Sequence, residues 1–169
     1  MSLNIGSHHP PAKNKPATPP QAVAGGAQMP QHSMVNLKTY IVEDSPVIRE
    51  NLIATLEEMV PLEVVGTAED ESSAVYWLSH HAQQCDLVII DIFLKGGSGL
   101  GVLRSTVNAR GRCKLVVFSN YATPDMRRKC LELGADKVFD KSNEIDALIN
   151  YCERLAAGGS GDTHHGDLI

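Results

Sequence analysis

Three short apolar runs in this chain each end in an oxygen-bearing side chain. TYIVED ends on Glu43 and Asp44, DLVIID ends on Asp91, and KLVVFS ends on Ser119. A fourth segment, ADKVFDK, ends on Lys141. Such runs are typical of buried parallel strands, whose carboxyl ends lie side by side and carry the ligand sites of open α/β sheets. We therefore expect three carboxylates, one hydroxyl and one ammonium group in a single crevice.

Amphipathic stretches separate the apolar runs, and this alternation predicts βα units around a parallel sheet. Helix N-caps are predicted at Ser45, Ser98 and Thr123, whose side chains can accept hydrogen bonds from the first helical turn. Gly134 is predicted to end a helix. We expect strands over residues 37–42, 62–68, 86–91, 114–119 and 137–139, with helices starting near 46, 71, 98, 123 and 143. The predicted fold is flavodoxin-like, (βα)5, a doubly wound parallel five-stranded sheet in the strand order 2-1-3-4-5.

Glu43, Asp44 and Asp91 cannot all be ionised within a few ångströms of one another without a cation, because like charges raise each other's pKa. Hard oxygen ligands favour a divalent metal such as Mg²⁺, or Mn²⁺ in its place. A carboxylate beside that metal can attack a phosphoryl group and carry it as an acyl phosphate. Lys141 and Ser119 would then bind the phosphoryl oxygens.

In order and position, these residues resemble the receiver domain of bacterial two-component response regulators, and the resemblance covers roughly residues 37–155. It implies that Asp91 is phosphorylated by a sensor histidine kinase or a histidine phosphotransfer protein. It also implies a metal held directly by Asp44 and Asp91, through water by Glu43, and by the backbone carbonyl of Phe93. Taken alone, Asp91 could instead be an ordinary strand-end acid that caps the next loop.

The resemblance further assigns a switch. Ser119 would move toward the phosphoryl group and Phe139 would turn inward, reshaping the face made by the fourth helix, the fifth strand and the fifth helix. A downstream protein would bind that face, and a phosphorylation-dependent homodimer is a further option. A static core ring at Phe139 remains an alternative.

Three residues near the crevice depart from the common receiver pattern or are bulky. Asn120 follows the hydroxyl residue, where alanine or glycine is frequent, and it would narrow access for phosphodonors. Tyr121 and Phe93 are both large. We predict that they hinder attacking water and prolong the life of the phosphoryl group.

Composition limits the other functions. The net charge of −5 and the absence of a basic stripe argue against direct contact with nucleic acid. The only short basic run, residues 127–129, is either an exposed partner surface or a solvated helix face. No apolar run is long enough for a membrane span, and no signal peptide is evident, so we expect a cytoplasmic protein. The four cysteines lack metal or redox spacing.

Residues 1–35 are rich in Pro, Ala, Gly and Gln, and we expect a flexible extension there. Residues 36–157 would form the receiver domain and 158–169 a flexible tail, so the chain is expected to be a stand-alone receiver without an attached output domain. It would be a phosphoacceptor that takes phosphoryl groups from small donors and loses them by its own hydrolysis, rather than an enzyme. A vestigial interaction module is the alternative. An aspartyl-phosphate hydrolase fits less well, because Ile92 and Phe93 follow Asp91 where that class has a second aspartate.

Overall fold

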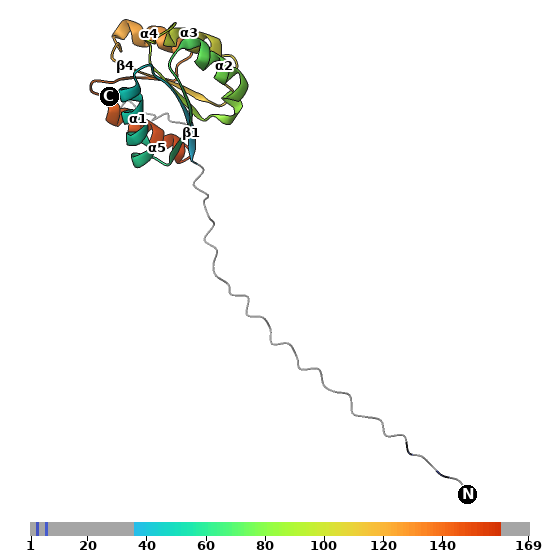
Figure 1. Ribbon diagram of the computed structural model, residues 1–169. Helices are drawn as coiled ribbons and strands as arrows, with labels where there is room; N and C mark the ends of the chain where they lie inside the picture. The colour runs from blue at the N-terminus through green and yellow to red at the C-terminus, as the bar shows by residue number, and fades with distance from the viewer. Residues whose placement is uncertain (1–2, 4–5, 7–35, 160–169) are drawn as a thin grey trace, which may run out of the picture. The chain divides into compact units, whose positions relative to one another are not determined.

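The expected strands form one parallel sheet in the order β2-β1-β3-β4-β5 in the computed structural model, which describes residues 3, 6 and 36–159. Every neighbouring pair is parallel. This arrangement confirms the predicted flavodoxin-like topology (Figure 1). The strands are β1 (Leu37–Val42), β2 (Leu62–Ala68), β3 (Leu87–Ile90), β4 (Lys114–Ser119) and β5 (Lys137–Asp140).

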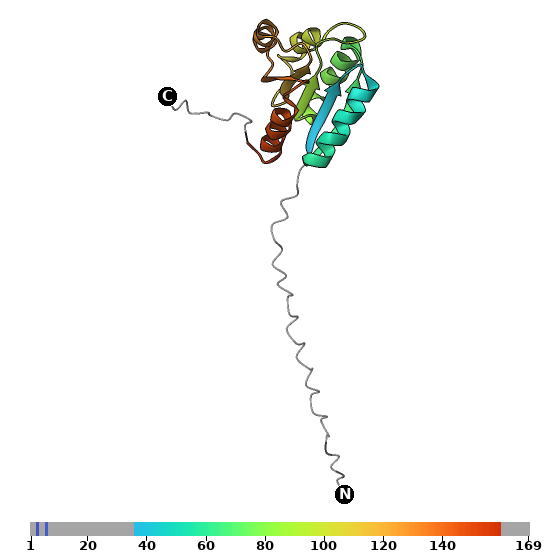
Figure 2. The same ribbon diagram turned by 90° about the vertical axis from the view of Figure 1, so that its left-hand side faces the viewer.

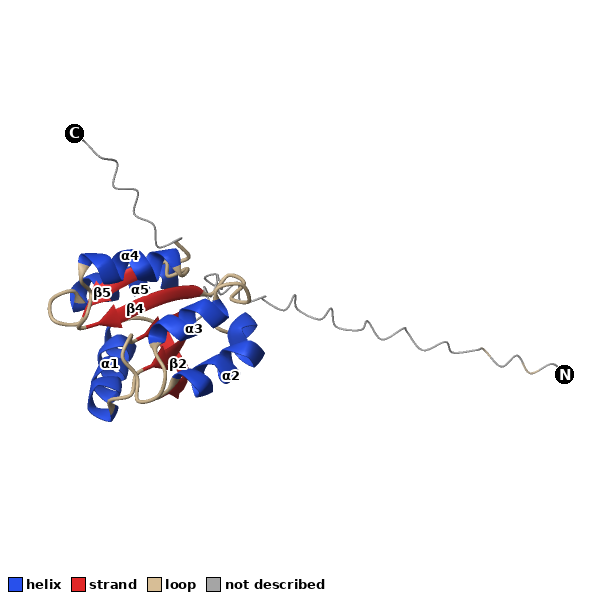
Figure 3. Ribbon diagram, turned by 90° about the horizontal axis from the view of Figure 1, so that it is seen from above, coloured by secondary structure: helices blue, strands red, loops and turns tan. Residues whose placement is uncertain are grey.

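Helices cover both faces of the sheet. Two core clusters follow from this, one with side chains of α2, α3 and α4 and the other with side chains of α1 and α5. Figures 1 and 2 show α1 and α5 together on one face, and Figure 3 shows the sheet from above with helices on either side of it. The helices are α1 (Pro46–Met59), α2 (Glu71–His81), α3 (Gly99–Thr106), α4 (Pro124–Glu132) and α5 (Ile145–Ala156), with a 3-10 turn, η1 (Ala82–Gln84), after α2.

The central strand β3 explains why one apolar run is continuous rather than alternating. Val88 and Ile90 face the cluster under α2, α3 and α4, whereas Leu87 and Ile89 face the cluster under α1 and α5. All four are buried. Burying each such side chain contributes about 1.5–3 kcal/mol, so β3 anchors the sheet and fixes the position of Asp91 just beyond it.

Side-chain caps set most helix starts. Ser45, Ser98 and Thr123 accept hydrogen bonds from backbone N–H groups three residues on, at 3.4, 3.3 and 3.2 Å, which confirms the three predicted N-caps. Gly134 follows α4 with φ +104, a left-handed conformation that glycine adopts without strain.

The last helix begins later than predicted, at Ile145 rather than near residue 143. Its N-cap residue, Glu144, makes no side-chain cap bond. The Glu144 carboxylate instead accepts hydrogen bonds from Arg127 and from the backbone N–H of Asp140. A tertiary ion pair therefore replaces the local cap.

The predicted extension over residues 1–35 and the tail over 158–169 lie almost wholly outside the described residues. None of the helices in the described part of the chain combines the length and the apolar character needed to cross a membrane.

Candidate functional site

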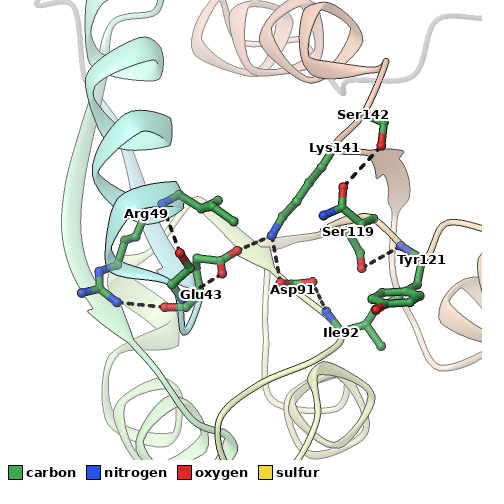
Figure 4. A network of polar contacts seen from close by, with 11 residues as sticks. Glu43, Arg49, Asp91, Ile92, Ser119, Tyr121, Lys141 and Ser142 are labelled. Carbon is green, nitrogen blue, oxygen red and sulfur yellow. Dashed lines mark hydrogen bonds and ion pairs between the residues drawn. The ribbon is translucent and has the colours of Figure 1, made fainter.

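Lys141 joins two of the predicted carboxylates at the carboxyl edge of the sheet. Its ammonium group donates a hydrogen bond of 2.8 Å to Asp91 Oδ2 and another to Glu43 Oε2. Figure 4 shows the lysine side chain reaching from the end of β5 to the two acids. The three side chains are only 9%, 11% and 3% exposed for Lys141, Asp91 and Glu43. The structure therefore brings together predicted site residues that lie far apart in the sequence.

A third carboxylate completes an acidic cluster. Oxygen atoms of Glu43, Asp44 and Asp91 all lie within 4.8 Å of one another. Burial raises the pKa of Glu43, although its hydrogen bond from Lys141 partly offsets that effect. Burial lowers the pKa of Lys141, but hydrogen bonds to Asp91 and Glu43 outweigh it and leave a net raised pKa. This set of hard oxygen donors, with one cation for three acids, fits a divalent metal ion such as Mg²⁺.

Glu43 is also held through its backbone and its second carboxylate oxygen. Its Oε1 accepts from Ser45 N–H at 3.1 Å, and its carbonyl oxygen accepts from Arg49 Nη1 at 2.9 Å. Arg49 reaches Glu69 as well, at 3.4 Å. Arg49 was not among the residues predicted for the site. The available signal was that it is the only lysine or arginine in α1.

Asp91 lies in a tight backbone environment. Its N–H donates to Val42 O at 2.9 Å, and its Oδ1 accepts from Ile92 N–H at 2.7 Å. A Cβ atom on Gly99 would lie 2.0 Å from the Asp91 carbonyl oxygen, so this close approach requires glycine. The loop after β3 is therefore folded back against the predicted nucleophile.

Ser119 is fully buried at the end of β4. Its hydroxyl accepts a hydrogen bond of 3.2 Å from Tyr121 N–H, which is the turn-forming role that competes with the predicted phosphoryl-binding role. Its carbonyl oxygen accepts from Lys141 N–H at 3.1 Å. The backbone thus ties the two residues to each other, while the role of the Ser119 hydroxyl toward a phosphoryl group stays a prediction.

Phe93 and Tyr121 form an aromatic pair near the crevice. Their ring centroids are 4.2 Å apart, and each residue is about half exposed. Asn120 is exposed, and its Oδ1 accepts from the Ser142 hydroxyl at 3.4 Å. The Asn120 side chain therefore contacts the loop after β5. The predicted effects of Asn120, Phe93 and Tyr121 on access to the crevice stay predictions.

Phe139 and the basic run complete the predicted set. The Phe139 ring is buried in the core beside Tyr151, with ring centroids 5.9 Å apart, and its switching role stays a prediction. The expectation of an exposed Arg127 is wrong. Its guanidinium is half-buried and donates to Ala122 O at 3.0 Å, to Val138 O at 2.9 Å and to the Glu144 carboxylate.

Comparison with known proteins decides the family. The family model of the response regulator receiver domain matches residues 39–153. The chain belongs to this family. Receiver domains bind Mg²⁺ through acidic residues, in agreement with the cluster of Glu43, Asp44 and Asp91.

Among curated proteins, this receiver is 33% identical over 119 residues to the transcriptional regulatory protein AruR of Pseudomonas aeruginosa, covering 70% of this chain and 48% of AruR. It is 26% identical to CitB of Klebsiella pneumoniae, covering 73% and 52% of the two chains. The chain thus spans about half the length of these relatives. The signal receiver domain of the putative response regulator NarL from Mycobacterium tuberculosis superposes with a TM-score of 0.63 at 21% identity, covering 73% of this chain and 98% of that one, and supports the fold.

Proposed function

We propose that this receiver accepts a phosphoryl group on Asp91 from a phosphohistidine of a sensor histidine kinase or a histidine phosphotransfer protein. The observation that carries the proposal is the Lys141 ammonium, bound to both Asp91 and Glu43 in a largely buried crevice. The Lys141 ammonium, together with a divalent cation held by the three carboxylates, would compensate further negative charge at this site. A phosphoryl group brings close to two such charges.

In this reaction an Asp91 carboxylate oxygen attacks the phosphorus atom. The P–N bond of the phosphohistidine breaks, its electron pair stays on the imidazole nitrogen, and Asp91 becomes an acyl phosphate. Lys141 stabilises the phosphoryl oxygens, because its charge is already fixed at Asp91 by a hydrogen bond of 2.8 Å.

Glu43, Asp44, Asp91 and the backbone carbonyl of Phe93 would hold Mg²⁺ or Mn²⁺. When bound, the metal supplies positive charge that compensates the phosphoryl oxygens and the three carboxylates. The protein would act as a phosphoacceptor rather than an enzyme. It would also take phosphoryl groups from small donors and lose them by hydrolysis at its own site.

Output would pass through the surface of α4, β5 and α5. Ser119 ends β4, Lys141 directly follows the neighbouring strand β5, and a backbone hydrogen bond joins them. A structural change at the phosphoryl group would therefore reach this surface through few residues. A downstream protein would read the change, or a second copy of the chain would bind. We do not propose a nucleic-acid partner for this domain, whose chain carries a net charge of −5.

Intact mass spectrometry after incubation with phosphoramidate tests the proposal. The expected result is a gain of one phosphoryl group that needs Mg²⁺, is abolished by a chelator and is absent in Asp91→Asn. Labelling that persists in Asp91→Asn would contradict the assignment. No labelling of the parent by phosphoramidate or by histidine kinases would favour a vestigial interaction module.

A further inference from the structure

Glu71, in the first turn of α2, holds a loop that belongs to a different part of the chain. Its Oε2 accepts a hydrogen bond of 2.8 Å from Ser98 N–H, and its own N–H donates to Gly96 O at 2.9 Å. The side chain is not needed as the cap of its own helix, because Asp70 fills that role by accepting from Ser73 N–H at 2.8 Å. The carboxylate of Glu71 therefore acts between segments.

Two glycines leave the space that this carboxylate occupies. A Cβ atom on Gly97 would lie 2.3 Å from Glu71 Oε2, and a Cβ atom on Gly101 would lie 2.0 Å from Glu71 Oε1. Gly97 also has φ +73, which side chains rarely adopt. Glu71, Gly97 and Gly101 thus fit as a set, which we call the Glu71 slot.

The held loop leads directly to the crevice. The backbone of Ser98 forms an antiparallel bridge with Phe93, and Gly99 N–H donates to Ile92 O at 2.8 Å. The segment from residue 92 to residue 99 is therefore closed on itself next to Asp91. Its far side is fixed to α2 by the carboxylate of Glu71. A hydrogen bond from an N–H group to an ionised carboxylate is about twice as strong as one between neutral groups.

We propose that Glu71 is a positioning residue for the metal-binding crevice: through Ser98 it holds the β3–α3 loop, and so the backbone carbonyl of Phe93, in place beside Asp91. This inference rests on the proposed function, because the carbonyl of Phe93 is a metal ligand only in that account. Glu71 itself does not touch the metal or the phosphoryl group. Groups hydrogen-bonded directly to metal ligands change metal affinity by about 10- to 100-fold when they are lost. Glu71 acts one step further out, through Ser98, so we expect an effect at the low end of this range.

Calorimetric titration with Mg²⁺ and hydrogen exchange without metal test the role of Glu71. Glu71→Ala and Gly101→Ala should each weaken Mg²⁺ binding by about tenfold, and amides of residues 92–99 should exchange faster while the β-strands remain protected. Glu71→Gln keeps an acceptor oxygen without the charge and should fall between Glu71→Ala and the parent. Gly96→Ala is the matched control, since its new Cβ would lie 3.5 Å from the Asp70 Cβ, an ordinary contact.

Thermal unfolding gives a second readout for the slot. Alanine normally stabilises a helix relative to glycine, so Gly101→Ala would raise the melting temperature if the slot were empty. The proposal predicts a lower melting temperature, because the new methyl group displaces the carboxylate.

Unchanged Mg²⁺ affinity and unchanged loop exchange in Glu71→Ala would overturn the inference while leaving the proposed function intact. A parent that binds no Mg²⁺ would instead contradict the proposed function. In that case the exchange measurement, which needs no metal, would still decide whether Glu71 holds the loop.

Discussion

Replacing Lys141 with methionine removes the one cation that the structure places between Glu43 and Asp91 while keeping a long apolar stem. Both carboxylates would remain in a site where the parent side chains are only 3% and 11% exposed. Removing one partner of a buried ion pair costs about 3–5 kcal/mol, because it leaves charge without compensation. We expect Lys141→Met to lose about 3 kcal/mol of unfolding free energy near neutral pH in the absence of divalent metal.

The loss should depend on pH. Burial already raises the pKa of Glu43, and the hydrogen bond from Lys141 opposes that rise, so the variant should have a still higher Glu43 pKa. A group with a raised pKa in the folded state stabilises the fold below its unfolded pKa, and this stabilisation is lost as pH rises through the folded pKa. The loss of unfolding free energy in Lys141→Met should therefore be larger at about pH 7 than at about pH 5, because protonation of Glu43 at the lower pH removes part of the uncompensated charge.

The raised pKa of Lys141 also stabilises the folded state at the lower pH values, but this contribution is lost over a different pH range. Its contribution is complete below the ordinary lysine pKa of 10.5 and disappears only as the pH rises through the higher folded value. The contribution of Lys141 is thus fully present in the parent at both pH values.

Urea unfolding in a chelating buffer at the two pH values measures these differences. Lys129→Met is the matched control, because Lys129 is exposed on α4, and it should change the unfolding free energy by less than about 0.5 kcal/mol. A Lys141→Met protein as stable as the parent, or a loss that is the same at both pH values, would refute the account of the buried charges.

Three further changes have defined outcomes. Tyr121→Ala removes the ring that packs on Phe93, and phosphoryl decay should become several-fold faster, whereas equal decay rates would exclude a shielding role. Thr123→Ala removes the hydroxyl that accepts a 3.2 Å hydrogen bond from Met126 N–H, and it should lower the free energy of unfolding, measured by chemical denaturation, by about 1 kcal/mol. Gly134→Ala forces a side chain into φ +104 and places its Cβ 2.2 Å from a valine methyl carbon, so it should cost at least about 2 kcal/mol; a smaller loss would mean that the backbone relaxes easily there.

Strand bounds could be predicted where an apolar run begins and ends sharply. The predicted limits for β1, β2 and β4 coincide with those of the structure. These strands are buried on one or both faces, and buried strands have apolar sequences, so the limits of an apolar run indicate the limits of the strand. The predicted β3 was one residue too long at each end, and the predicted end of β5 was one residue short. The predicted start of α5 was two residues early, because Glu144 bonds to Arg127 rather than capping its own helix.

The three bonded residues of the candidate site could be predicted because each lies at or directly after the end of a predicted strand. Residues at strand ends are placed by topology alone, and this brought Glu43, Asp91 and Lys141 together. The contacts of Arg49 and Glu71 could not be predicted this way. They depend on where a helix side chain points and on space left by glycines in another segment, and neither is visible in local sequence patterns.

The position of the phosphoryl group distinguishes phosphorylation of Asp91 from modification of other residues. Phosphoramidate can also modify imidazoles, and the chain contains seven histidines, so a mass gain alone does not identify the acceptor. Borohydride reduces an aspartyl phosphate to homoserine, and peptide mass spectrometry then reads the modified position. We expect homoserine at residue 91 alone, formed only when Mg²⁺ was present during labelling. Homoserine at residue 44, or a phosphoryl group found only on histidine, would contradict it.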